Sequence, residues 1–185
     1  MSMVRECTRD IEMLENCAWA LLLQPEDAQM KKVYQSRFIV PGTKDHIPLC
    51  ESILRLGSES TKLRASSARC AAMKAKRYYD QAGFNYEAIR NMPGIHGMIP
   101  ADHLAVELLF VAHALKHELR ARDVGEEESA RVWRGLAERF TREHARGGVE
   151  CACLRMESTE GDVYCKVMES ARRELALISE VKVLE

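Results

Sequence analysis

Apolar residues recur at steps of three and four along nearly the whole chain, and this periodicity constrains the fold more than any other feature. In the first segment Ile11, Leu14, Ala18 and Leu21 fall on one side of a helix, and charged residues lie mostly between them. Similar segments begin near residues 25, 48, 58, 100, 126 and 162. No segment alternates apolar and polar residues as a β-strand would. The sequence therefore predicts an all-α fold, a compact bundle of seven to eight or more helices.

Glycine and proline indicate where these helices end. Residues 93–99 contain three helix breakers in seven positions, which predicts a kinked, hinge-like loop near the middle of the chain. Pro100 is expected to restart a helix after it, and Gly147-Gly148 is expected to end the helix that begins near Glu126. The chain has 185 residues, the usual size of one domain. We therefore expect residues 1–185 to form a single domain.

Charge and composition exclude several classes of partner. The 27 Lys and Arg residues balance the 28 Asp and Glu residues, so there is no basic excess to favour nucleic acid. The longest apolar run near the N-terminus, Cys17 to Leu23, is far shorter than the roughly 20 residues of a membrane span, which argues against membrane insertion. No secretory signal is visible, and the odd, scattered cysteines do not form a disulfide framework. We expect a soluble cytoplasmic protein with reduced thiols.

The sequence contains no local pattern of catalytic chemistry. Neither phosphate-binding loop, GxxxxGK[ST] or GxGxxG, is present, and there is no GxSxG turn of a serine hydrolase. His113 and His117 are four residues apart, with Glu107 and Glu118 nearby, but they do not form HExxH. A solvent-facing histidine pair is the favoured interpretation. The sequence therefore predicts neither an enzyme nor a bound cofactor.

A second possible ligand group lies near the C-terminus. Cys151 and Cys153 are separated by one residue, with His144 before them and Cys165 after them. Thiolates are good soft metal ligands, but this spacing is not that of a zinc finger. Free cysteines usually pack as small apolar residues, so we predict no metal site here. A small metal- or redox-responsive helical protein that uses these four residues is the alternative function.

The most informative segment begins at Pro100. Proline fixes the first turn, Asp102 stands where free backbone N–H groups favour an anion, and His103 lies beside it. Glu107 follows one turn later, on a helix side flanked by apolar residues. There it could pair with an incoming Arg or Lys, although a capping role or pairing with His103 fits equally well.

Four short motifs resemble those of the TorD/DmsD/NarJ family of redox-enzyme maturation chaperones. The segment from Pro100 to Phe110 is similar to the family's PxDH-x₃-E-L-x-F signature. Upstream of it, in matching order, stand a Tyr-x₃-Phe-x₂-Pro-Gly segment (34–42), a Pro-x₂-Glu-Ser segment (48–52) and a Tyr-x₃-Gly segment (79–83). A looser match, Phe-x₃-His, covers 140–144, but Ala-Arg-Gly-Gly follows it here where the family often has Leu and an aromatic-Pro stretch.

This resemblance implies an all-helical cytoplasmic chaperone. Its partners would be the apo form of a molybdopterin oxidoreductase catalytic subunit and that subunit's twin-arginine leader, which the chaperone binds until the cofactor has been inserted. The implied leader-binding residues are Tyr34, Phe38, Pro100, Asp102, His103 and Glu107. Glu126-Glu127-Glu128 is a weaker acidic candidate. The oligomeric state expected is a monomer or a homodimer.

Overall fold

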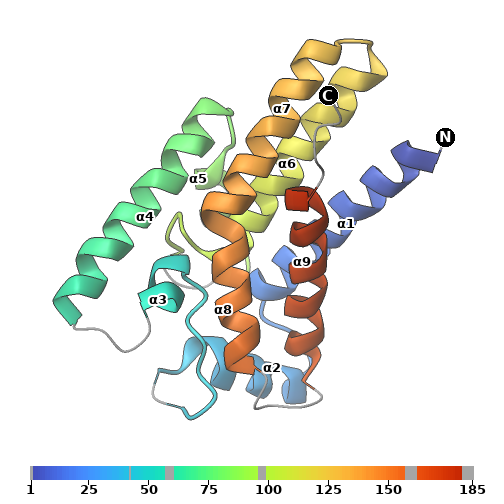
Figure 1. Cartoon of the computed structure of the whole chain (residues 1–185). Helices are drawn as coiled ribbons and strands as arrows, with labels where there is room; N and C mark the ends of the chain where they lie inside the picture. The colour runs from blue at the N-terminus through green and yellow to red at the C-terminus, as the bar shows by residue number, and fades with distance from the viewer. Residues whose placement is uncertain (1, 42, 57–60, 96–98, 157–161, 181–185) are drawn as a thin grey trace.

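The computed structural model describes residues 2–41, 43–56, 61–95, 99–156 and 162–180. Within these ranges the chain forms helices and no β-strand, which confirms the predicted all-α fold (Figure 1). In chain order the elements are α1 (Ser2–Leu22), α2 (Ala28–Tyr34), the π-helix η1 (Gln35–Ile39), α3 (Glu51–Leu56), α4 (Thr61–Gln81), α5 (Tyr86–Arg90), α6 (Leu104–Asp123), α7 (Glu127–Phe140), the π-helix η2 (Thr141–Ala145), α8 (Arg146–Met156) and α9 (Val163–Glu180).

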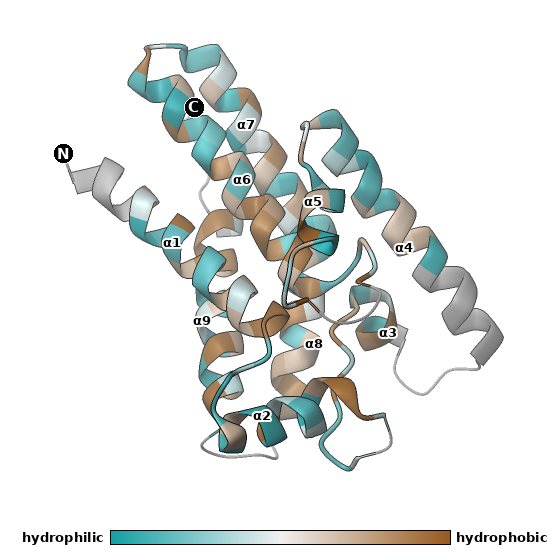
Figure 2. Ribbon diagram, turned by 180° about the vertical axis from the view of Figure 1, so that it is seen from behind, coloured by the Kyte–Doolittle hydropathy of each residue, from teal (hydrophilic) through white to brown (hydrophobic). Residues whose placement is uncertain are grey.

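Helix α6 forms the centre of the molecule. Every residue from Leu104 to Ala112 is buried, so this helix is covered on all sides over its first two turns and beyond. A helix that is apolar all round is stable only inside a protein. It packs against α1 on one side and α7 on another. In Figure 2 hydrophobic colouring marks the part of the bundle around α6, and it also marks the segment that follows α2.

Helices α1, α8 and α9 close the bundle around this centre. The predicted apolar side of α1 is buried, with Leu14, Ala18 and Leu21 fully inaccessible to solvent. It packs against α9 as well as α6, so the first and last helices of the described chain lie side by side (Figure 1). The Cys17 thiol lies 3.4 Å from the backbone oxygen of Val167 across this contact.

Helix α4 lies at one side of the molecule and reaches the core near its C-terminal end (Figure 1). There Tyr79 is fully buried, and its hydroxyl donates a 2.7 Å hydrogen bond to the backbone oxygen of Ala101. The Tyr79 ring packs against Phe110 and Phe140, whose ring centroids are 4.4 Å apart. This aromatic cluster fixes α4 against α6 and α7.

Several helix boundaries differ from the sequence expectation. The helix after Pro100 begins only at Leu104, with His103 as its N-cap, because residues 100–102 form a turn. The predicted end at Gly147-Gly148 is wrong: η2 joins α7 to α8, and the helical path continues from Glu127 to Met156. A Cβ atom on Gly148 would lie 2.5 Å from a methyl carbon of Leu104. Glycine at this position permits close helix packing and does not end a helix.

The predicted break before Pro100 is present where the structure describes it. Residues 93–95 and 99 are not helical, and Gly94 has a φ of +88°, a conformation that favours glycine. Residues 96–98, like Gly42 and Gly57, lie outside the described residues. None of the helices in the described part of the chain combines the length and apolarity needed to cross a membrane.

Candidate functional site

Four of the six residues implicated by the resemblance line one cavity. Tyr34, Phe38, Pro100 and His103 form part of the wall of a cavity of about 300 Å³ between the end of α1, the α2–η1 segment and the turn before α6. We call it the Tyr34 cavity. Most of its remaining wall is apolar, and the other lining residues are Leu21, Leu22, Ile39, Pro41, His46, Pro48, Leu49, Cys50 and Ile99.

A second cavity, of about 530 Å³, adjoins the first. The two share Leu22, Tyr34 and Ile39 as wall residues. The second cavity is completed by more polar residues, namely Gln24, Lys31, Gln35 and Gly94. The Ile39 side chain is 49% exposed, which places an apolar group on the open surface where the cavities meet. Together they form an apolar recess with a polar border.

Tyr34 and Phe38 are held in place by the rest of the fold. The Tyr34 hydroxyl donates a 3.0 Å hydrogen bond to the backbone oxygen of Leu21, which ties α2 to the end of α1. Burial raises the pKa of this hydroxyl, so it stays a neutral donor. The Phe38 ring packs edge-to-face against Tyr34 and Tyr164, with centroid distances of 5.4 and 4.9 Å. The recess therefore has a rigid aromatic wall.

His103 caps helix α6. Its Nδ1 accepts a 3.3 Å hydrogen bond from the backbone N–H of Ala105, which satisfies one of the free N–H groups of the first turn. Acting as an acceptor requires Nδ1 to be unprotonated, and burial lowers the pKa of His103 to about 4. His103 therefore lines the Tyr34 cavity as a neutral imidazole.

Asp102 points inward and not toward the cavity. Asp102 is only 2% exposed. Its Oδ2 accepts a 2.5 Å hydrogen bond from the Ser52 hydroxyl and a 3.3 Å hydrogen bond from the Ser52 N–H. Burial raises the pKa of this carboxyl, and the bonds from Ser52 work against that rise. The sequence placed Asp102 at the start of its own helix, whereas the structure shows it capping the start of α3.

Glu107 is fully buried, so its interpretation as an acid at the rim of an apolar surface is wrong. The residue is 0% exposed, and neither carboxyl oxygen has a donor from a backbone or side-chain N–H or hydroxyl group. Burial raises the pKa of Glu107 well above the ordinary value, and the nearby charge of Glu51 raises it further. An incoming arginine cannot reach this carboxyl from the surface in the described conformation.

Behind the Tyr34 cavity, Glu107 belongs to a buried polar group with Glu51 and His144. Glu51 Oε2 lies 2.9 Å from His144 Nδ1, and Glu51 Oε1 lies 3.0 Å from Arg55 Nη1. Burial acts to raise the pKa of Glu51, but hydrogen bonds with His144 and Glu107 and the charge of Arg55 together lower it. Glu51 is therefore the more acidic of the two carboxyl groups. We call Glu51, Glu107 and His144 the buried triad.

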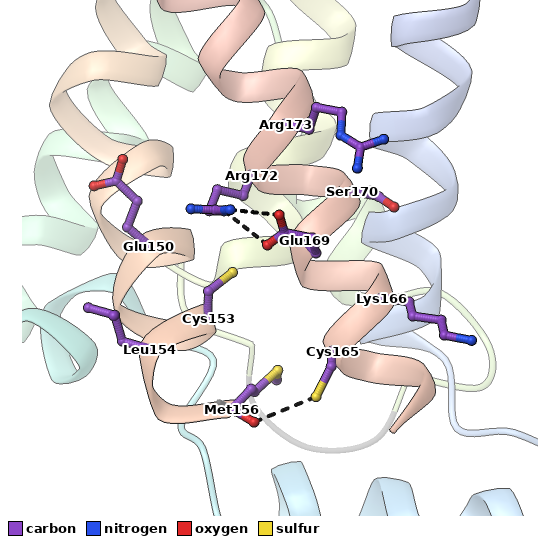
Figure 3. A pocket seen from close by; sticks show the side chains of 10 residues that line it. All are labelled: Glu150, Cys153, Leu154, Met156, Cys165, Lys166, Glu169, Ser170, Arg172 and Arg173. Atoms are coloured by element: carbon purple, nitrogen blue, oxygen red, sulfur yellow. Dashed lines mark hydrogen bonds and ion pairs between the residues drawn. The ribbon is translucent and has the colours of Figure 1, made fainter. Parts of the chain in front are cut away.

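The predicted alternative site around the C-terminal cysteines is not assembled. Among the described residues, the group whose ligand atoms approach closely enough for a metal ion is the buried triad, and it contains no cysteine. His144 therefore belongs with two carboxylates and not with Cys151, Cys153 and Cys165. Cys153 and Cys165 instead line a cavity of about 700 Å³ between α8 and α9 (Figure 3). Burial raises the pKa of the Cys153 thiol to about 11, which makes it a poor source of thiolate.

The other candidates from the sequence have structural roles. His113 and His117 are neither fully solvent-facing nor part of a ligand group in the described chain. His117 stacks on Trp133 with a centroid distance of 4.3 Å, and His113 Nε2 lies 3.3 Å from the backbone oxygen of Ala82. The acidic run 126–128 lies at the start of α7, at the opposite end of the molecule from α2 (Figure 1). It does not contribute to the recess.

Sequence reasoning overlooked the partners that organise the site. Glu51 and Ser52 belong to one family-like motif and His144 to another. Nothing in the sequence indicated that residues of these two motifs contact each other. Their order along the chain gave no sign that α3, α6 and η2 meet. The apolar wall residues Leu21 and Leu22 were assigned only to the core side of α1. Helix α1 ends at Leu22, and the chain that follows it reaches the border of the recess at Gln24.

A comparison with known protein families identifies the family of this chain. The family model described as nitrate reductase delta subunit matches residues 5–146 of the chain. This range includes the residues of the Tyr34 cavity, the buried triad and all six leader-binding residues expected from the sequence. It ends where α8 begins. A search of curated proteins finds no match to this chain.

Proposed function

Because the chain belongs to the nitrate reductase delta subunit family, a family of chaperones that mature molybdoenzymes, we propose that it binds the leader peptide of such an enzyme in the recess beside Tyr34. The client would be the apo form of a molybdopterin oxidoreductase catalytic subunit with a twin-arginine leader. Binding would take place in the cytoplasm and delay export until the cofactor has been inserted. In this role the protein acts by binding and not as an enzyme.

One observation carries this proposal: residues from two separate sequence motifs meet on one apolar recess. Tyr34 and Phe38 come from the motif at 34–42, and Pro100 and His103 come from the motif at 100–110. Sites that bind helical or extended peptides bury apolar anchor side chains in pockets of this kind. The two adjoining cavities, of about 300 and 530 Å³, offer room for several such side chains.

The leader's arginines must be recognised by groups other than Asp102 and Glu107. Those carboxyls are 2% and 0% exposed. Exposed acids do stand beside the recess: Glu26 and Asp27 lie in the chain between Gln24 and Lys31, both of which line the second cavity. Asp27 also accepts a hydrogen bond from the Met30 N–H, so its carboxylate is oriented at the start of α2. We assign the apolar part of the leader to the cavities and the arginine pair to this acidic border.

A binding experiment with one surface variant tests the proposal. The probe is a fluorescent peptide with the twin-arginine leader of a molybdopterin oxidoreductase catalytic subunit. Ile39→Asp places a charge where both cavities meet, and because Ile39 is 49% exposed the variant should remain folded. Losing the burial of one such side chain should weaken binding by about 10- to 100-fold.

Val132→Asp is the matched control, since Val132 is a β-branched residue on α7 that is 61% exposed and lies outside the recess. Its peptide affinity should equal that of the wild type. If both variants bind the peptide equally well, or if the wild type does not bind it, the recess is not the leader site.

A further inference from the structure

The buried triad has the composition and geometry of a metal site. Glu51 begins α3, Glu107 lies in the first turn of α6, and His144 lies in η2. One ligand atom from each lies within 4.8 Å of the other two, and the three residues are 3%, 0% and 4% exposed. We propose that the buried triad binds one divalent transition-metal ion, a site that neither the sequence analysis nor the family match assigns.

Glu107 provides an independent reason to expect a ligand. Its two carboxyl oxygens are buried and have no N–H or hydroxyl donor among the described residues, and one of them lies within 4.8 Å of the ligand atoms of Glu51 and His144. A buried polar group without a hydrogen-bond partner costs about 1–3 kcal/mol, and more if it is charged. Proteins rarely keep such a group unless something occupies the space in front of it. A cation coordinated by Glu107 would supply that partner, and so would a proton shared with Glu51.

The donor atoms suit a transition metal. One imidazole nitrogen and two carboxylate oxygens are ligands that divalent manganese, iron, cobalt and zinc all accept. Two metal–ligand bonds of about 2.1 Å at a right angle separate their ligand atoms by about 3 Å. The 2.9 Å distance from His144 Nδ1 to Glu51 Oε2 matches neighbouring ligands of one ion. Glu107 needs a side-chain rotation toward the pair to complete a three-residue site.

Arg55 has a supporting place outside the ligand set. Its Nη1 holds one oxygen of Glu51, Oε1, while the other, Oε2, faces His144 Nδ1, the contact that an ion would replace. Its Nη2 donates hydrogen bonds of 3.2 and 3.0 Å to the backbone oxygens of Glu143 and His144. Outer partners that fix the orientation of ligating groups are a regular part of metal sites. Arg55 therefore links two of the three segments that would hold the ion.

An ion has a path to the triad from solvent. Glu51 and His144 line a cavity of about 270 Å³ between α3, α4 and η2, while Glu107 does not line it. The remaining wall residues are Ser52, Arg55, Cys70, Ala71, Lys74 and Glu143. Glu107 thus lies at the inner end of the triad and the other two ligands at its outer end. An ion entering between α3 and α4 meets Glu51 and His144 first.

The competing occupant of the same space is a proton shared by Glu51 and Glu107. That arrangement keeps Glu107 neutral and needs no metal. The two possibilities make opposite predictions for metal binding by the wild-type chain. A titration of that chain with a metal ion therefore distinguishes them.

Mn²⁺ is the appropriate probe. The chain has seven cysteines, which would capture thiophilic ions such as Zn²⁺, whereas Mn²⁺ prefers oxygen and nitrogen ligands. The full chain is freed of metal with a chelator that is then removed, and free Mn²⁺ is followed by its electron paramagnetic resonance signal. We expect saturable binding of one ion per chain. Added Mn²⁺ should also raise the thermal midpoint of the wild type.

Glu107→Gln replaces the proposed carboxylate ligand with an uncharged amide of nearly the same size. We expect it to bind Mn²⁺ at least about tenfold more weakly and to lose the Mn²⁺-dependent rise in thermal midpoint. Glu143→Gln is the control, because Glu143 neighbours His144 and lines the same cavity but lies outside the triad. It should bind as the wild type does.

Two results would overturn the proposal: no saturable Mn²⁺ binding by the wild type, or equal binding by the two variants. Circular dichroism verifies that Glu107→Gln is folded; if it is not, His144→Gln is judged by the same tenfold criterion. None of these measurements uses the leader peptide. Failure of the metal site and failure of the leader site are therefore separate results.

Discussion

Buried polar residues behind the recess connect segments that are distant in the sequence. Asp102 accepts two hydrogen bonds from Ser52, fifty positions earlier in the chain. The backbone adds to this link, since the Glu51 N–H donates to the Asp102 oxygen and the Leu104 N–H to the Leu49 oxygen. At the scale of single residues, Asp102 and these backbone hydrogen bonds therefore position the start of α6 against α3. Their substitution should affect stability first.

Asp102→Ala should lower the free energy of unfolding by about 1–3 kcal/mol, because it leaves the buried Ser52 groups without their acceptor. Leader affinity of the folded variant should change less than about threefold, since the carboxyl does not face the recess. Denaturant unfolding and peptide titration on the same samples measure the two effects.

A double-mutant cycle with Ser52→Ala provides the internal check, and the coupling energy should be about 0.5–3 kcal/mol. Asp80→Ala, which breaks an exposed pair with Lys76, should change stability by less than about 1 kcal/mol. A large loss of leader affinity with unchanged stability would instead place Asp102 in the binding surface.

His103 should make stability depend on pH. Burial lowers its pKa from 6.5 to about 4 in the folded protein. Between these values the unfolded chain binds the proton and the folded chain does not, so the free energy of unfolding falls as pH decreases from 6.5 toward 4. Above pH 6.5 this contribution is fully present. His103→Asn keeps a good N-cap acceptor that does not titrate.

The measurement is the difference between the urea stability curves of wild type and His103→Asn at a series of pH values. The other histidines contribute equally to both proteins and cancel in this difference. The variant should gain relative to the wild type as the pH falls below 6.5. Parallel curves would show that Nδ1 of His103 does not lose its acceptor role on acidification.

At the scale of elements, the two π-helical segments and the glycines near them decide which side chains meet. The sequence correctly indicated α1, α6, α7 and α9, because their apolar residues repeat with the helical period. It did not indicate η2 or α8, because Gly147-Gly148 has the composition of a helix end. Whether a glycine ends a helix or permits close contact depends on the neighbouring element, which the local sequence does not contain. The position of His144 in the buried triad was hidden for the same reason.

Gly148→Ala tests this close contact. A Cβ atom would lie 2.5 Å from a Leu104 methyl carbon and 3.5 Å from the Glu51 Cα, and Leu104 is fully buried. We expect a loss of about 1–3 kcal/mol in stability, even though alanine favours helix. Gly135→Ala in α7 is the control, since its Cβ would meet nothing within 4 Å. That variant should gain up to about 1 kcal/mol.

Thermal and urea unfolding of both alanine variants give the comparison. A stabilised Gly148→Ala would mean that α3 and α6 have room to separate from α8, contrary to the packing described above.

At the scale of the whole molecule, a buried ion pair joins the recess to the last helix. Arg37 Nη2 lies 2.6 Å from Asp162 Oδ2, and the two side chains are 6% and 9% exposed. The residues are 125 positions apart, and Asp162 also accepts a hydrogen bond from the Tyr164 N–H at the start of α9. The sequence could not predict this pair, since no local pattern relates Arg37 to a residue 125 positions later.

Asp162→Asn should lower the free energy of unfolding by about 3–5 kcal/mol, because it leaves the Arg37 guanidinium buried without its counter-charge. The double variant Arg37→Met with Asp162→Asn should recover much of this loss. Denaturant unfolding of the three proteins provides the measurement. Lys76→Ala, in an exposed pair, should cost less than about 1 kcal/mol. A single variant as stable as this control would show that water reaches Arg37.

The contact between α1 and α9 has a consequence for how the chain is made. A ribosome releases α1 first and α9 last, and synthesis proceeds at about 5–20 residues per second. Until α9 has left the ribosome, the side of α1 that carries Cys17 has no partner to cover it. The nascent protein therefore spends several seconds with part of its first helix exposed. During that interval the uncovered side of α1 is an apolar surface on which contacts with other chains can compete with α9.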